Sequence, residues 1–488
     1  MNILSDRFSE IKKASEPLYR TPKSVQETVE ILKISEGGIF EVAEGRYSKT
    51  YRFSDVNYAT RTENEQESFF QKYCKCLNSF DCTFKITVNN RNRDMEALRN
   101  EVMLGLRNDG FDEMRESYNR IIEEKILEGR QGIEQERYIT VTVKRKNFEE
   151  AKAQFATIEN TMLKSFAELG SRLTPLSGNE RLRILHDYYR LGREDEFNFD
   201  IKKGRITGTD FRNEICNSSI KYHPDHFEDE GKVGRVLFIK KYPTYLSDRF
   251  FTEFTFLPVH SITSVDVVPV PKDLTMKMLQ KKYLGIESDI IKQQRTRNRN
   301  NDFSSDISYA TRQKKRDIEE IMNNVRENDE SLFYVSVTMI VMAESKDELD
   351  SICETIDSIA KGAGCAVDTC MYRQREAINT TLPIGVRQIE TMRTMLTQSL
   401  AVLMPFNVQE LCDSDGIYYG VNQISRNIIV GNRKKLLNGN GFIFGVSGAG
   451  KSFQAKMEMG SVLLSTDDNV IAVDPMSEYE DVAEKYNG

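Results

Sequence analysis

The pattern of apolar and polar positions predicts strands and helices in succession along most of the chain. Residues 38–53 alternate between apolar and polar types, and Glu44-Gly45 lies within this run. A period of two residues is typical of a half-buried strand, and a glycine at the turn favours a hairpin. The stretch 63–77 that follows indicates a helix. The first elements are therefore expected to be a β-hairpin and a helix.

One order of elements then occurs twice. It consists of a strand, a long charged helical stretch, a strand, a helix that begins with acidic residues, a glycine and a short strand. Tyr138-Ile-Thr-Val-Thr-Val and Tyr334-Val-Ser-Val-Thr-Met match in pattern. We predict two duplicated β-α-β-rich α+β modules resembling ferredoxin-like units, with chance recurrence of common patterns as the alternative. The elements are expected at 84–89, 96–128, 138–143, 149–169 and 172–176, and again at 264–270, 274–327, 333–342, 346–360 and 365–372.

The last fifty residues follow another pattern. The sequence Gly441-Phe-Ile-Phe-Gly-Val-Ser-Gly-Ala-Gly-Lys-Ser452 predicts a strand over 441–444, a glycine-rich loop, and a helix over 453–466. Such a loop points consecutive backbone N–H groups into one concavity, and the helix N-terminus behind it attracts anions. This is the arrangement of a P-loop, which binds nucleotide phosphates. We expect the phosphates on Gly445, Val446, Ser447, Gly448, Ala449, Gly450, Lys451 and Ser452.

Two side chains of this loop have distinct expected roles. The Lys451 ammonium would reach the β- and γ-phosphates of ATP, and the Ser452 hydroxyl would hold Mg²⁺. A short parallel strand is expected over 469–474, completing a β-α-β unit. Asp474 ends that strand and is a candidate metal-organising acid, although the acid commonly lies on a later strand. We expect it instead to support the metal ligands without contacting the ion, or to have a structural role.

The expected organisation has five parts. They are a polar arm (1–25), a first α+β module (26–193), a polar loop (194–233), a second α+β module (234–399) and the start of an α/β P-loop domain (400–488). Because only 37 residues follow Lys451, no later acidic strand or arginine finger is present. We expect an amino-terminal portion of a longer ATPase, or a site that binds nucleotide without turning it over.

Composition narrows the classes of function. The net charge of −7 gives no global basic field for nucleic acid, and no apolar run approaches the 18 residues of a spanning helix. Eight scattered cysteines favour reduced thiols, including Cys74, Cys76 and Cys82. His223-Pro-Asp-His226 lies in a polar stretch without a further ligand pattern, so a metal site is not favoured there.

A basic zone within 274–327 has two interpretations. The first is a solvated helical face without a binding function, and the second is a contact with DNA, lipid headgroups or an acidic partner. The zone consists of Arg295, Arg297, Arg299, Arg312, Lys314, Lys315 and Arg316.

Several ordered motifs resemble the large motor ATPase of conjugative type IV secretion systems, in the TraC-like form found on Gram-positive mobile elements. The loop 438–453 is one of them. The others are Thr381-Leu-Pro-Ile-Gly385, Leu403-Met-Pro-Phe406, Gly416-Ile-Tyr-Tyr-Gly-Val-Asn422 and Asp474-Pro-Met-Ser-Glu-Tyr479, with weaker likeness at Arg46-Tyr-Ser-Lys-Thr-Tyr51 and Glu180-Arg-Leu-Arg-Ile-Leu-His186.

The resemblance implies a cytoplasmic, RecA-like hexameric ATPase, peripheral on the inner face of the membrane. It also implies docking on inner-membrane secretion proteins, ATP-driven assembly or transport during conjugation, and possible DNA contact. Only the loop Gly445 to Ser452 carries over among the family's site residues. Two alternatives stay open: a DNA-pumping translocase of the FtsK or HerA kind, and an assembly platform that holds nucleotide without hydrolysis.

Overall fold

One large antiparallel sheet forms the centre of the protein. The computed structural model describes residues 22–92, 95–128, 133–243, 245–299, 309–408, 411, 413, 415–422, 427–436 and 438–488, so most of the expected arm 1–25 lies outside the described residues. Thirteen described strands form this sheet, in the order β1-β2-β3-β5-β4-β10-β11-β9-β8-β7, with β6 beside β3, β12 beside β9 and β13 beside β11. They are β1 (Lys33–Ile34), β2 (Ile39–Ala43), β3 (Arg46–Phe53), β4 (Thr83–Asn92), β5 (Ile133–Lys144), β6 (Leu173–Pro175), β7 (Ile220–Tyr222), β8 (Phe227–Asp229), β9 (Lys232–Lys241), β10 (Ser261–Val270), β11 (Leu332–Ala343), β12 (Ala366–Thr369) and β13 (Arg393–Leu396).

The sheet consists of two halves with the same strand order. The first half reads β6-β3-β5-β4 and the second β12-β9-β11-β10, and the two join where β4 pairs antiparallel with β10. The repeated order predicted from the sequence is present, and a further strand and helix precede each copy. Helix α2 (Glu63–Asn78) in the first half corresponds to α9 (Arg249–Thr255) in the second, and α5 (Phe148–Leu169) corresponds to α12 (Lys346–Gly362). The helix pair α3 (Met95–Val102) and α4 (Asp112–Glu128) corresponds to the pair α10 (Lys272–Arg299) and α11 (Tyr309–Glu327).

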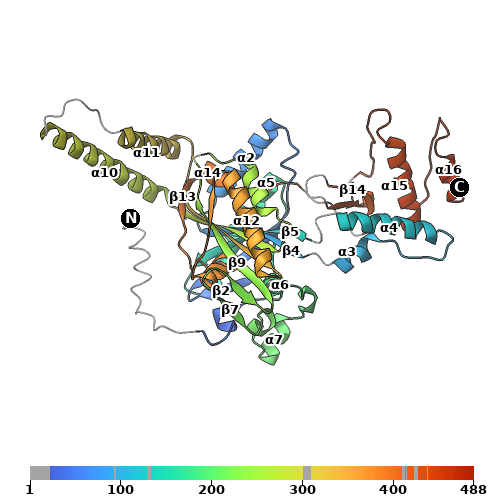
Figure 1. The fold of residues 1–488 in the computed structure, drawn as a ribbon, viewed down its shortest axis with the longest axis horizontal. Coiled ribbons are helices and arrows are strands. Elements are labelled where there is room, and N and C mark those ends of the chain that lie inside the picture. Colours follow the sequence, from blue (N-terminus) through green and yellow to red (C-terminus); the bar gives the residue numbers. More distant parts are fainter. Residues whose placement is uncertain are drawn as a thin grey trace.

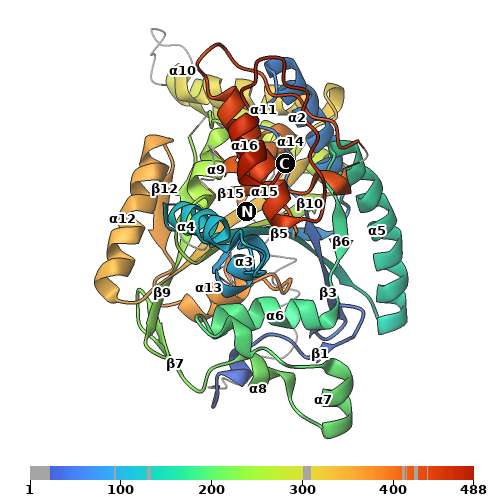
Figure 2. The ribbon, with the colours of Figure 1, turned by 90° about the vertical axis from the view of Figure 1, so that its right-hand side faces the viewer.

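Helices cover both faces of the sheet. Along β4, Phe84, Ile86 and Val88 point into a core shared with one set of helices, and Lys85 and Thr87 point to the opposite face. Figure 2 shows α5 and α12 at the two sides of the molecule and α6 crossing below them. The first set comprises α2, α5, α9, α12 and α14 (Thr397–Ala401), and the opposite core includes α6 (Gly178–Tyr189), α7 (Ile201–Thr207), α8 (Phe211–Ile215) and α13 (Gln374–Thr381).

A polar stripe crosses the centre of that opposite face. The chain after α13 lies over it, and we call residues 382–391 the strap. The strap's backbone carbonyls accept hydrogen bonds from the sheet: Ser48 Oγ donates to Ile384 O at 2.6 Å and Lys85 Nζ donates to Val386 O at 3.1 Å. Arg387 forms a bidentate pair with Asp266. These bonds satisfy buried polar groups that would otherwise destabilise the fold.

Two expectations about local structure were wrong. The helix expected over 96–128 is two helices, because the intervening turn has left-handed backbone at Asn108 and Gly110. The stretch 194–233, expected to be a loop, contains α7, α8, β7, β8 and the start of β9. Aspartates cap its helices: Asp200 accepts from Lys203 N and Asp210 from Arg212 N.

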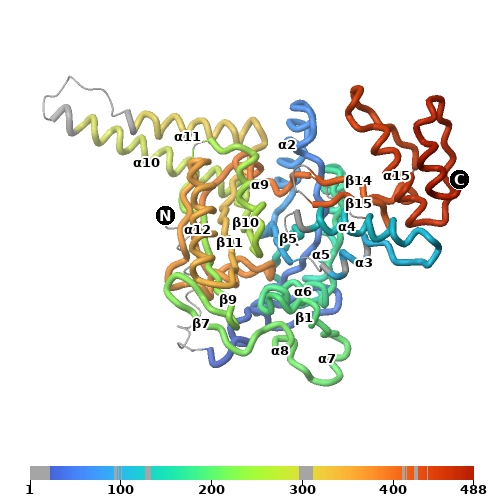
Figure 3. The backbone as a smooth tube through the Cα atoms, turned by 45° about the vertical axis from the view of Figure 1, so that its right-hand side comes forward, coloured from blue at the N-terminus to red at the C-terminus, as the bar shows by residue number. Residues whose placement is uncertain are grey.

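The helix pairs inserted in the two halves lie at opposite ends of the molecule. The α10–α11 pair projects from one end (Figure 1), and α3 and α4 lie at the other end beside the carboxyl-terminal elements (Figure 3). Those elements are β14 (Ile417–Val421), β15 (Ile428–Gly431), α15 (Lys451–Ser465) and α16 (Glu480–Lys485). Within the part of the chain that the structure describes, no helix has the length and apolar character needed to cross a bilayer.

Buried His260 is expected to make folding sensitive to acid. Burial lowers its pKa from 6.5 to about 4, with Arg91 adding to this effect and Asp187 opposing it. Between pH 6.5 and 4 the unfolded chain takes up a proton that the folded chain excludes, so stability falls as the pH falls. From pH 7 to pH 5 the wild type should lose about 2 kcal/mol more than His260→Gln. Urea unfolding followed by circular dichroism at both pH values measures this difference, and equal losses would contradict it.

Candidate functional site

The glycine-rich loop leads directly into α15. Gly448 and Gly450 have φ values of 82° and 84°, in the left-handed region that favours glycine, and Gly450 is the N-cap of α15. At Gly445 a Cβ would lie 3.2 Å from the Ala449 Cβ and 3.3 Å from the Lys451 Cγ. The helix expected after the loop is present and begins at Lys451. Its free N–H groups and the positive end of its dipole therefore face the loop.

The two polar side chains of the loop contact nearby groups. Lys451 Nζ donates to Val446 O at 2.9 Å, which holds the ammonium over the loop. Ser452 Oγ donates to Glu478 Oε2 at 2.9 Å. A hydroxyl and a carboxylate at this distance are oxygen ligands of the kind that Mg²⁺ prefers.

Asp474 stabilises the turn that follows residues 469–474. Its carboxylate accepts from Met476 N at 3.2 Å and from Tyr479 N at 2.8 Å, so it shapes the turn that brings Glu478 to Ser452. Sequence reasoning missed Glu478 as the acid nearest Ser452. The only available signal was its place in the motif 474–479.

The two strands expected on either side of α15 are not formed. Residues 441–444 and 469–474 have no strand assignment, and neither pairs with a strand in the described part of the chain. Strands require backbone partners, which an apolar run cannot supply by itself. Large apolar side chains around the loop are consequently exposed: Phe442, Phe444, Val446, Phe453, Ile471 and Val473.

The helix pair of the first half anchors the end of α15. The Arg115 side chain is buried, with only 1% exposure, and its Nε donates to Leu464 O at 3.3 Å. Its guanidinium also pairs with Asp109 and Asp112. Arg107 Nη2 donates to Ser465 O at 3.0 Å. The loop is thereby connected through α15 to elements inserted between β4 and β5.

The hairpin β14–β15 contacts α15 from another direction. Tyr419 Oη donates to Glu458 Oε1 at 3.0 Å, and Arg433 pairs with Glu458 at 2.7 Å. Tyr418 lies against the apolar cluster of Leu98, Val102, Tyr118, Ile122, Ile126, Ile428 and Val430. A single assembly of α3, α4, β14, β15 and α15 thus positions the candidate site.

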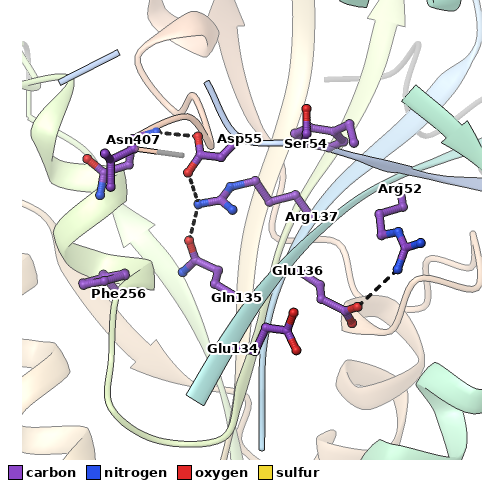
Figure 4. A pocket seen from close by; sticks show the side chains of 11 residues that line it. Arg52, Ser54, Asp55, Glu134, Gln135, Glu136, Arg137, Phe256 and Asn407 are labelled. Carbon is purple, nitrogen blue, oxygen red and sulfur yellow. Dashed lines mark hydrogen bonds and ion pairs between the residues drawn. The ribbon is translucent and has the colours of Figure 1, made fainter. Parts of the chain in front are cut away.

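A cavity of about 240 Å³ lies where the chain leaves the sheet toward that assembly (Figure 4). Asp55 accepts from Asn407 N at 2.8 Å and pairs with Arg137, whose Nε donates to Pro405 O at 2.6 Å. Burial raises the pKa of Asp55, although Arg137 opposes this shift. Because these charged groups bind the backbone of residues 405–407, the cavity marks an anchor of the connection rather than a reaction centre.

The other candidate residues are three cysteines in the core and the basic zone on the inserted helices. Burial raises the pKa of the Cys74, Cys76 and Cys82 thiols to about 12, which favours protonated thiols over metal ligands. The basic zone lies on α10 and α11, where Lys315 pairs with Glu287 at 3.1 Å. The side chains of Arg297 and Arg299 lie outside the described residues.

No protein-family model matches this chain, and no curated protein matches it.

Proposed function

We propose that the loop 445–452 binds ATP with Mg²⁺, and that the chain is the ATP-binding part of a motor ATPase of the conjugative type IV secretion kind. One observation carries the nucleotide proposal: two left-handed glycines place Lys451 at the first position of a 15-residue helix, with its ammonium over the loop. A triphosphate entering the loop meets the helix N-terminus and the ammonium together. The backbone and side-chain donors therefore fit this ligand.

The proposed roles follow from the contacts. Lys451 Nζ, now 2.9 Å from Val446 O, exchanges this carbonyl for the β- and γ-phosphate oxygens. Ser452 Oγ would hold Mg²⁺, and the Glu478 carboxylate beside it would add negative charge that favours the ion. Bound Mg²⁺ neutralises charge on the phosphates. Hydrolysis by the motor is part of the proposal and requires an acid that orients the attacking water.

The remainder of the chain is proposed to form the docking part of the motor. The strand orders β6-β3-β5-β4 and β12-β9-β11-β10 support two ferredoxin-like modules related by duplication. The resemblance in sequence motifs supports a RecA-like P-loop domain, hexamer formation, contact with inner-membrane secretion proteins and DNA, and a cytoplasmic position on the inner face of the membrane. ATP binding at the contact between subunits would then bias their packing, and hydrolysis would drive assembly or transport.

Calorimetric titration of the 488-residue chain with ATP tests the nucleotide proposal directly. We expect saturable binding in the presence of Mg²⁺ and at least about tenfold weaker binding of AMP, which lacks the phosphates that Lys451 and Mg²⁺ contact. Chelation of Mg²⁺ with EDTA should also weaken ATP binding. Absence of heat and of a thermal shift in folded protein, or equal binding of AMP and ATP, would overturn the proposal.

A further inference from the structure

The β7–β8 hairpin, at the far edge of the sheet from β1, brings together two histidines and a glutamate. Pro224 and Asp225 form its turn, and His223 N donates to His226 O at 2.8 Å. Next to the turn Tyr222 pairs with Phe227, and then Lys221 pairs with Glu228. Because side chains alternate along a strand, His223, His226 and Glu228 lie on one face of the hairpin. The sequence showed the histidines but not Glu228, whose place depends on the register.

The potential ligand atoms of these three residues converge. All lie within 4.8 Å of one another. The imidazole rings are 4.4 Å apart and inclined by 8°, and His223 Nε2 lies 3.3 Å from Glu228 Oε1. A tetrahedral ion with bonds of about 2.0–2.1 Å requires ligand atoms about 3.3–3.4 Å apart. One pair already has this spacing, and small rotations of partly exposed side chains bring in the third ligand.

Hydrogen bonding fixes which nitrogen of His226 is available. His226 Nδ1 lies 2.7 Å from Asp225 Oδ1. Asp225 is itself held by Arg235 at 3.0 Å and Lys346 at 2.9 Å. A carboxylate paired with two cationic side chains accepts a hydrogen bond from Nδ1–H of His226, which leaves Nε2 with its lone pair for a metal.

His223 has an unsatisfied nitrogen close to the potential ligand atoms of His226 and Glu228. His223 Nε2 is buried from solvent and has no hydrogen-bond partner among the described residues, although Glu228 lies close to it. A metal ion between this nitrogen and the carboxylate would satisfy the nitrogen and add a second cation beside Glu228, which already lies 3.7 Å from Lys221 Nζ.

We propose that His223, His226 and Glu228 form a binding site for a divalent transition metal, with zinc as the best fit and a fourth position for water. Two imidazoles and one carboxylate are a ligand set typical of zinc, and the carboxylate–histidine contact at Asp225 is the usual support of such a ligand. Mg²⁺ prefers oxygen ligands and is excluded here by the imidazoles. The ion would tie the short β7–β8 hairpin together at the edge of the sheet.

Zinc titration of the full chain under reducing conditions tests this site, with calorimetry and metal content as readouts. We expect one zinc equivalent in the wild type and at least about tenfold weaker binding in the double variant His223→Gln, His226→Gln and in Glu228→Gln. Lys221→Ala is the control on the same face: Lys221 Nζ lies 3.7 Å from Glu228 Oε2 and competes with the metal for that carboxylate, so this variant should bind zinc at least as tightly as the wild type.

A second readout separates this site from the cysteines and from loss of folding. Zinc should raise the melting temperature of the wild type and of Lys221→Ala, but not that of the double variant, whose melting temperature without metal should match the wild type. Equal zinc stoichiometry and affinity in the wild type and the double variant would assign the metal to thiols and overturn the proposal. Absence of zinc binding in the wild type would also overturn it.

Discussion

Lys451→Ala is expected to weaken Mg²⁺-dependent ATP binding at least about 100-fold while the protein stays folded. An ammonium about 4 Å from a phosphate charge contributes about 4 kcal/mol at an effective dielectric constant near 20, and a loss of about 2.7 kcal/mol is already 100-fold. The contact that Lys451 makes in the protein is one hydrogen bond to Val446 O. Its removal should change the free energy of unfolding by no more than about 0.5 kcal/mol.

Lys456→Ala provides the matched control for this prediction. Lys456 lies on the same helix, one and a half turns further on, and its Nζ lies 5.7 Å from the centre of the Tyr479 ring. We expect this variant to bind ATP within about threefold of the wild type, because a charge more than one helical turn beyond Lys451 is screened from the phosphates and contributes little. Titration calorimetry and the melting temperature together decide the outcome. Undiminished ATP binding by Lys451→Ala would show that the loop is not the nucleotide site.

Much of the fold follows from local patterns in the sequence. The alternation along β4 and β5, and the acidic starts of α5 and α12, depend on neighbouring residues only, so both copies of the repeated order were predictable. The strap was not, because its binding to the sheet joins Ser48 to Ile384 across 336 positions. Contacts at such separations have no signature in one sequence.

In the candidate site, too, features set by neighbouring residues were predictable and features set by distant contacts were not. Glycines and a lysine at fixed spacing predicted the loop and α15, which depend on local backbone conformation. The strands predicted at 441–444 and 469–474 did not form, because an apolar run favours a strand but becomes one only where a neighbouring strand pairs with it. Glu478 and Glu228 were missed for another reason. Each becomes a candidate ligand only when a turn brings it to Ser452 or to His223.

Gly385→Ala is expected to destabilise the protein by about 4 kcal/mol or more, since two separate effects act at one position. Gly385 has a φ of 87°, which costs a residue with a side chain about 1–2 kcal/mol. The added Cβ would also lie 2.7 Å from the Ser48 Cβ and 2.6 Å from the Thr142 Oγ1. A hydroxyl can rotate away, but the Ser48 Cβ is fixed to the backbone of β3. The strap would have to lift from the polar stripe and lose the hydrogen bonds of its carbonyls.

Gly170→Ala separates backbone strain from this steric clash. Gly170 ends α5 with a φ of 79°, close to that of Gly385, but a Cβ there meets no atom within 4 Å. This variant should therefore lose only about 1–2 kcal/mol. Chemical denaturation followed by circular dichroism gives both values. A larger loss for Gly385→Ala would show that the close contact of the strap with β3 and β5 contributes to stability, and equal losses would show that backbone conformation alone requires glycine at 385.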